Sequence, residues 1–203
     1  MAVARSTQRL SEAEYLEIER HAAFKSEFYD GEMFAMSGGT RWHSLIAANC
    51  IAELRNQTKE GRCTVYDSNL RVKVEATGLH TYPDVTVACG SQRFADDEDD
   101  ALVNPTLIIE VLSDSTEAYD RGKKFEHYRQ IPSLREYVLI SQREPRIEQF
   151  LRQESGEWVL REIVGRESRL PLPALNAAIA LEEIFAGVEF SPGPLRSTPR
   201  TGK

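Results

Sequence analysis

The alternation of apolar and polar residues is most informative at Asn104–Ser113, a short apolar stretch that carries one carboxylate. Glu110 is surrounded there by four apolar residues, namely Leu107, Ile108, Ile109 and Val111. A run this short and rich in β-branched residues predicts a strand buried on both faces. An ionised glutamate in such a strand needs a partner or a metal ion, because its desolvation is costly. A buried salt bridge, or a strand-end position that reaches water, would also explain it.

A second stretch of the same kind precedes the first. Thr81–Cys89 is also apolar and β-branched, and it carries Asp84 directly after Pro83. Proline is tolerated at the first residue of a strand, so we expect Asp84 at a strand entrance. Two core strands with one carboxylate each predict a site for a hard cation such as Mg²⁺, which is commonly held by one or two carboxylates.

The N-terminal part of the chain predicts a hairpin over Ser26–Met36, with Asp30 and Gly31 as its two-residue turn. In this register Phe28 faces Met33 on one side of the hairpin. The other side carries three residues, namely Glu27, Tyr29 and Phe34.

A helix is expected to follow, capped by Thr40 and ending near Lys59, with Gly61 closing it. Its apolar arc comprises five residues, namely Ile46, Ala47, Cys50, Ile51 and Leu54, and His43 falls near the middle of this arc. Two interpretations stay open: a satisfied core histidine near a helix N-terminus, or a side chain aimed at the same interior as the two carboxylates.

The remaining elements come from capping residues, periodicity and breakers. We expect a short helix opened by the Ser11–Glu14 capping box, a loop at 75–80 and a solvated acidic loop at 94–100. Capping residues at 113–116 predict one helix over 117–130, and the chain should end in a short helix or strand-helix unit at 174–185. The predicted strands span 63–66, 70–74, 136–140, 146–152 and 158–164. This order predicts an α/β or α+β fold, in which helices flank a central mixed sheet.

Two adjacent lysines on the predicted helix over 117–130 are not equivalent. At 100° per residue, Lys124 lies within roughly 40° of the centre of the apolar arc, whereas Lys123 lies roughly 140° away. Lys123 is therefore predicted to be solvated, and Lys124 to point towards the strands that carry Asp84 and Glu110. The alternative is that Lys124 extends along Tyr128 to the surface.

Composition limits the remaining possibilities. The chain has 203 residues and a net charge of −7, which argues against broad, non-specific binding to a nucleic-acid backbone. We expect a flexible arm at 1–9, one domain at 10–190 and a flexible basic tail at 191–203. Three cysteines without a CxxC pattern suggest reduced thiols in a cytoplasmic protein, and no stretch approaches the length of a membrane span.

The motifs together resemble a known family. "YPDV", followed by "IIEVLS", resembles the PD-(D/E)XK nuclease core with its restriction-endonuclease-like fold. With "SEFYDGEMFAMSGG…H" and "YDRGKKFEHYRQIPSLREYVLIS", the chain is similar over about residues 10–187 to the Uma-two family of endonucleases. The resemblance implies a central mixed sheet flanked by helices and an Mg²⁺-dependent DNA endonuclease, with Mn²⁺ as a possible substitute.

The resemblance also implies roles for particular residues. Asp84 and Glu110 would hold the metal, and His43 and Glu27 match positions that are typical of the family. The parent pattern has a lysine two residues after the acid, where this chain has Leu112. The resemblance suggests that the lysine has moved to the following helix, where Lys124 is already distinguished by its helical phase.

Other functions stay open at this stage. The protein could be a catalytically degenerate member of the fold that serves as a nucleic-acid-binding or interaction module, or a hydrolase of small phosphoesters. RNA is not excluded as a substrate. A homodimer is expected, because cutting both strands of a duplex requires two sites.

Overall fold

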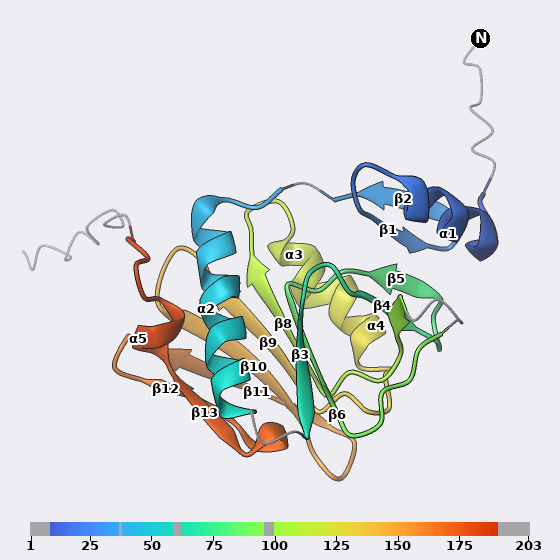
Figure 1. The fold of residues 1–203 in the computed structure, drawn as a ribbon. Helices are drawn as coiled ribbons and strands as arrows, with labels where there is room; N and C mark the ends of the chain where they lie inside the picture. The colour runs from blue at the N-terminus through green and yellow to red at the C-terminus, as the bar shows by residue number, and fades with distance from the viewer. Residues whose placement is uncertain (1–8, 37, 59–61, 96–99, 191–203) are drawn as a thin grey trace, which may run out of the picture.

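A six-stranded mixed sheet forms the centre of the protein in the computed structural model, which describes residues 9–36, 38–58, 62–95 and 100–190 (Figure 1). Its strand order is β11-β10-β9-β8-β6-β3, and only β8 and β9 run parallel. The strands are β3 (Cys63–Asp67), β6 (Val85–Cys89), β8 (Leu107–Leu112), β9 (Glu136–Ser141), β10 (Arg146–Arg152) and β11 (Trp158–Val164). All six residues of β8 are buried, which confirms the prediction for this strand.

One face of the sheet packs against α2 (Arg41–Gln57). Ile46, Cys50 and Leu54 of this helix pack in one core with the strand residues that point to this face of the sheet, among them Ile109 of β8. The C-terminal elements complete this core; they are β12 (Arg169–Leu172), the 3₁₀ turn η2 (Pro173–Leu175), β13 (Ala177–Ala180) and α5 (Leu181–Ile184). The predicted strand-helix unit at 174–185 is therefore confirmed, and β12 was missed.

The other face of the sheet packs against the segment predicted as one helix over 117–130. That prediction is wrong in detail: the segment consists of α3 (Glu117–Tyr119), the π-helical turn η1 (Asp120–Lys124) and α4 (Phe125–Tyr128). Thr116 precedes it without capping it through its side chain. Ile108 and Leu112 of β8 lie in this second core with Tyr128, so Glu110, between them in the alternation, faces the same side.

A second sheet, not predicted as such, has the order β2-β1-β5-β4-β7. It contains β1 (Ser26–Tyr29), β2 (Glu32–Ala35), β4 (Arg71–Val74), β5 (Leu79–Thr81) and β7 (Ala101–Leu102), and α1 (Glu12–His21) lies beside it (Figure 1). The hairpin register and the capping box of α1 are confirmed. The predicted loop over 75–80 is wrong at its end, because β5 pairs with both β4 and β1 and these pairings use its backbone groups.

The expectation of three reduced cysteines is also wrong. Cys63 and Cys89 form a disulfide, while Cys50 is a buried free thiol. The two bonded residues lie 26 positions apart in the chain but directly opposite each other in the β3–β6 pairing. The sheet makes these two cysteines neighbours, and their spacing along the chain did not reveal it.

Some predictions fall on residues outside those described, namely the arm over 1–8, Gly61 as a helix stop, the centre of the acidic loop at 96–99 and the tail at 191–203. Among the described residues, no helix is both long and apolar enough to cross a membrane.

Candidate active site

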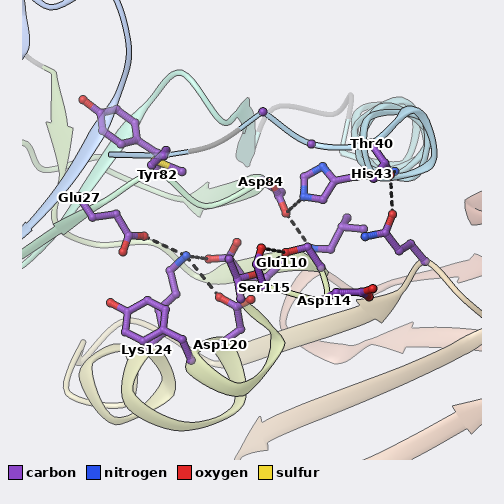
Figure 2. A pocket seen from close by; sticks show the side chains of 18 of the residues that line it. Glu27, Thr40, His43, Tyr82, Asp84, Glu110, Asp114, Ser115, Asp120 and Lys124 are labelled. Atoms are coloured by element: carbon purple, nitrogen blue, oxygen red, sulfur yellow. Dashed lines mark hydrogen bonds and ion pairs between the residues drawn. The ribbon is translucent and has the colours of Figure 1, made fainter. Parts of the chain in front are cut away.

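A pocket with a volume of about 1290 Å³ opens where β6 begins and β8 ends, and Figure 2 shows its floor. Its walls come from the β1–β2 hairpin, the N-terminal turn of α2, the end of β8 and the α3–η1 segment. The register of β6 against β8 pairs Val85 with Ile109, so one further step places Asp84 opposite Glu110. The pairing of two antiparallel strands thus brings together the two carboxylates that the sequence placed 26 residues apart.

Lys124 lies at the centre of a group of carboxylates on this floor (Figure 2). Its Nζ is 2.9 Å from Glu110 Oε1, 3.1 Å from Glu27 Oε1 and 3.6 Å from Asp120 Oδ1. The Lys124 side chain is only 6% exposed, and its three partners are similarly buried. We call Lys124 with these three acids the carboxylate–lysine cluster.

Other side chains fix the carboxylates of this cluster. The Tyr128 hydroxyl donates to Glu110 Oε1 at 2.9 Å, and the Thr81 hydroxyl donates to Glu27 Oε1. Tyr137 donates to the backbone carbonyl of Asp120 and so anchors the π-helical turn. The turn η1 is π-helical and therefore wider than an α-helical turn, and π-helical turns often occur at functional sites.

Three carboxyl groups surround one lysine in the cluster. Burial raises the pKa of Glu110 to about 8, against the opposing effect of Lys124, and the charges of Asp84 and Asp120 raise it further. Burial also raises the pKa of Asp120. Burial by itself would lower the pKa of Lys124, but Glu110, Glu27 and Asp120 outweigh it and hold that pKa well above its ordinary value. The lysine therefore stays protonated, and it does not neutralise all of its partners.

Asp84 forms a second group beside this cluster. Its Oδ2 accepts a hydrogen bond from the backbone N–H of Val111 at 2.7 Å and lies 3.1 Å from Nε2 of His43. The hydrogen bond to Asp84 raises the pKa of His43, despite the opposing effect of burial. Thr40 caps α2 and thereby positions the first turn that carries His43. A Cβ atom at Gly39 would lie 2.7 Å from Nδ1 of His43, so the glycine permits this ring position.

The structure brings all five predicted site residues to one pocket, but in two contact groups. Lys124 contacts Glu110 and Glu27, whereas Asp84 contacts His43. Lys124 is buried and does not extend to the surface, while the Lys123 side chain is 73% exposed and pairs with Glu126, so the predicted difference between the two lysines is confirmed.

The structure also bears on the alternatives that the sequence left open for Glu110 and His43. Glu110 does form a buried ion pair, but it does so on the floor of an open pocket. The His43 side chain is 20% exposed and lines that pocket, so it does not fill the core.

Asp120 and Tyr128 were missed by sequence reasoning. Asp120 lies four residues before Lys124, a spacing that places two helical side chains on one face, so the signal was present. Tyr128 was considered only as a side chain along which Lys124 could extend, because a phenol hydroxyl that reaches a buried carboxylate leaves no pattern in the sequence.

The donor set fits a hard cation. Among the described residues, the hydrogen bonds and ion pairs of the two strand-end carboxylates engage Oδ2 of Asp84 and Oε1 of Glu110, so their second oxygens face no protein donor. Oxygen ligands from one or two carboxylates suit Mg²⁺, which retains several waters. No group of three or more His, Cys, Asp or Glu side chains in the described part of the chain is arranged to hold a metal ion.

The central mixed sheet flanked by helices is a restriction-endonuclease-like fold. A crystal structure of a protein from Anabaena variabilis, described as "a putative nuclease belonging to DUF820", has the same fold, with a TM-score of 0.71 at 18% identity. That likeness covers 89% of this chain and 99% of the other.

Sequence comparison identifies the family. The sequence profile of the Uma2 family, described as "Putative restriction endonuclease", matches residues 12–182. Two uncharacterised proteins of Synechocystis sp., slr1290 and sll1609, are each 34% identical to this chain. The first match covers 90% of this chain and 94% of slr1290; the second covers 84% and 96% of sll1609. The chain belongs to the Uma2 family.

Proposed function

We propose that this protein is an Mg²⁺-dependent endonuclease that hydrolyses phosphodiester bonds in DNA. One observation carries the proposal: on the floor of an open pocket, buried carboxylates outnumber the single lysine that they surround. Unbalanced buried charge is costly unless a ligand or a cation compensates for it. The description of the family and that of its structural neighbour support the same class of reaction.

Asp84 and Glu110 are the residues that would hold the metal. Mg²⁺ bound there would polarise the scissile phosphate and lower the pKa of an attacking water. The backbone hydrogen bond from Val111 holds Asp84, and Tyr128 holds Glu110. Both carboxylates are therefore oriented before a substrate arrives, which favours tight geometry in the transition state.

Lys124 supplies a fixed positive charge next to these ligands. Its ammonium group is kept protonated by three carboxylates, so it can donate hydrogen bonds to the attacking water or to a phosphate oxygen that gains charge in the transition state. Glu27 and Asp120 orient the ammonium group.

His43 provides a second proton donor on the opposite side of Asp84. The hydrogen bond to Asp84 raises the pKa of His43, which extends the imidazolium form to higher pH, and the side chain lines the pocket. A protonated imidazole at this position can donate a hydrogen bond to the phosphate or a proton to the leaving oxygen.

The presence of Leu112 where the PD-(D/E)XK pattern has a lysine does not by itself indicate a degenerate enzyme. Leu112 alternates with Glu110 and lies on the same face of β8, where it packs in the core that also contains Tyr128. Lys124 reaches Glu110 on that face from the π-helical turn. A cation is therefore present beside the acid, although it comes from another element of the chain.

The direct test is incubation of the purified protein with supercoiled plasmid and with single-stranded DNA, in Mg²⁺, in Mn²⁺ and in EDTA. We expect cleavage with either metal and none in EDTA, and loss of cleavage in Asp84→Asn. Cleavage that persists in EDTA, or in Asp84→Asn, would contradict the metal assignment. Absence of cleavage on every nucleic acid tested, with the protein folded, would leave a binding module as the better description.

We also propose a homodimer, since each chain contains one site and two sites are needed to cut both strands of DNA, whether the duplex is intact or locally melted. Light scattering coupled to size-exclusion chromatography measures the mass directly. A monomer at assay concentrations would contradict this part of the proposal.

A further inference from the structure

The pocket above the carboxylate–lysine cluster has aromatic walls. Four large aromatic side chains are exposed among the described residues, and all of them except Phe24 line this pocket; the three are Tyr29, Phe34 and Tyr119. The half-buried Trp42 lines it as well. Exposed apolar groups that gather in one place mark a binding surface, whereas scattered ones need no explanation.

The β1–β2 hairpin places two of these rings beside the candidate catalytic residues. Glu27 and Phe34 are direct partners in the hairpin register, so their side chains share one face. Tyr29 lies two residues from Glu27 and therefore on the same face. Glu27 contacts Lys124, which fixes this face against the cluster. The Tyr29 ring also packs edge-on against His127, with 4.6 Å between the ring centroids.

The charges that line the pocket do not suit a DNA duplex. Its Lys and Arg side chains are Lys123, Lys124 and Arg143, and each already has a carboxylate partner. A duplex concentrates about one negative charge per 1.7 Å of helix axis and is bound through many phosphate contacts. A single strand has a lower charge density, and aromatic rings can bind its unstacked bases without a cation for each phosphate.

We infer that the pocket selects unpaired DNA: bases of a single strand stack on Phe34 and Tyr29, and this stacking places the adjacent phosphodiester over the carboxylate–lysine cluster. The inference rests on the proposed nuclease function and specifies its substrate as a single-stranded or locally melted segment. Stacking on aromatic rings tolerates any base, so little sequence preference is expected from this contact.

Binding is tested separately from cleavage. The full chain carrying Glu110→Gln, without divalent metal, is titrated into an oligonucleotide of about 12 nucleotides, a length within the range of single-strand sites. The oligonucleotide contains 2-aminopurine, whose fluorescence falls when the base stacks, and it is used single-stranded and annealed to its complement. We expect tighter binding of the single strand, with quenching.

Two phenylalanines provide a matched pair for this experiment. Phe34→Ala should weaken binding of the single strand by roughly ten-fold or more and remove the quenching. Phe24→Ala removes a more exposed ring outside the pocket and should change neither. Phe34→Tyr keeps an aromatic face and should retain both, which separates stacking from any effect on folding.

The outcomes distinguish this inference from the proposed function. Equal or tighter binding of the duplex, or equal effects of Phe34→Ala and Phe24→Ala, would overturn the inference even if the wild-type chain cuts duplex DNA with Mg²⁺. Selective, quenched binding of the single strand by a chain that cuts no DNA with either metal would uphold the binding site and contradict the nuclease proposal.

Discussion

Two charged clusters in the described part of the chain differ in how many cations surround a carboxylate. One is the carboxylate–lysine cluster of the pocket. The other, which we call the arginine network, lies between α1 and the second sheet and joins Arg71, Arg20, Asp100 and Glu19, with Tyr82 as a bridge. Both arginines of the network contact the single carboxylate of Asp100, whereas one lysine faces three carboxylates in the pocket.

The pKa shifts of the acids follow this difference. Burial raises the pKa of Asp100, but Arg71 outweighs it and the net direction is down. The net direction is up for Glu110 and Asp120, where burial dominates and the nearby charge is mostly negative. The two arginines thus favour the ionised form of Asp100 in the native state. A cluster in which carboxylates outnumber the cation is suited to binding an additional cation and to catalysis, because perturbed carboxylates concentrate at functional sites.

Glu110→Gln should show the functional difference between the two clusters most strongly. If Glu110 is a metal ligand, the substitution should lower the cleavage rate by roughly 10³-fold or more. It should also stabilise the metal-free protein at pH 8. The folded pKa of about 8 lies above the ordinary value of 4.5, so the unfolded chain loses this proton first and wild-type stability falls as the pH rises between these values.

Thermal melts of both proteins in EDTA from pH 4.5 to 9 measure this slope. The slope should be smaller in Glu110→Gln, and Mg²⁺ should reduce it in the wild type by favouring the ionised carboxylate. A destabilised Glu110→Gln with unchanged activity would show that the pocket behaves as the arginine network does.

Arg71→Met should have the opposite profile. Arg71 is buried, and its loss leaves Asp100 without its closest cation and removes a contact over the Tyr15 ring, so we expect a loss of about 3 kcal/mol of unfolding free energy. Cleavage per folded molecule should hardly change. Arg93→Met, which removes an exposed pair with Glu75, should cost roughly 0.5 kcal/mol or less. Urea unfolding and active-site-normalised rates check both; a large rate loss in Arg71→Met at unchanged stability would argue against a structural role.

Lys124→Met and Lys123→Met test whether the two adjacent lysines of η1 have different roles. Lys124→Met should lower the rate by about 10²-fold, or about 2.7 kcal/mol, because the transition state loses its cation. It should also destabilise the fold, since the buried acids lose their only lysine. Lys123→Met should cost roughly 0.5 kcal/mol or less, because its charge is solvated. Single-turnover cleavage of a labelled oligonucleotide measures the rates, and equal effects would refute the assignment of Lys124.

Gly39→Ala should give the smallest of these effects, through the position of His43. A methyl group at residue 39 would overlap the imidazole, whereas a Cβ at Gly38 meets nothing within 4 Å. We expect a rate loss of roughly ten-fold for Gly39→Ala, because small displacements of positioned groups are costly. Gly38→Ala is the control and should leave the rate near wild type. Cleavage rates measured from pH 5 to 9 would show whether the part of the pH–rate profile that depends on the protonation of His43 is lost. An unaltered profile in Gly39→Ala would argue against a role of His43 in the mechanism.

Local features of this protein were readable from its sequence. The apolar run around Glu110 predicted its buried strand, the Asp30–Gly31 turn predicted the hairpin register, and helical phase separated Lys124 from Lys123. Each of these depends on neighbours within a few residues, where backbone geometry fixes the direction of side chains. The π-helical turn is the exception, since the same residues also fit an α-helix.

Only the tertiary structure decided which distant residues meet. The β6–β8 register set Asp84 opposite Glu110, and the β3–β6 register joined Cys63 to Cys89. The arrival of Asp120 and Glu27 at one lysine determined the charge of the site, and with it the direction of the carboxylate pKa shifts. Composition and periodicity determine how a side chain points from its own element. The electrostatics of a buried site depend on distances between elements, and these are set only when the sheets and helices pack together.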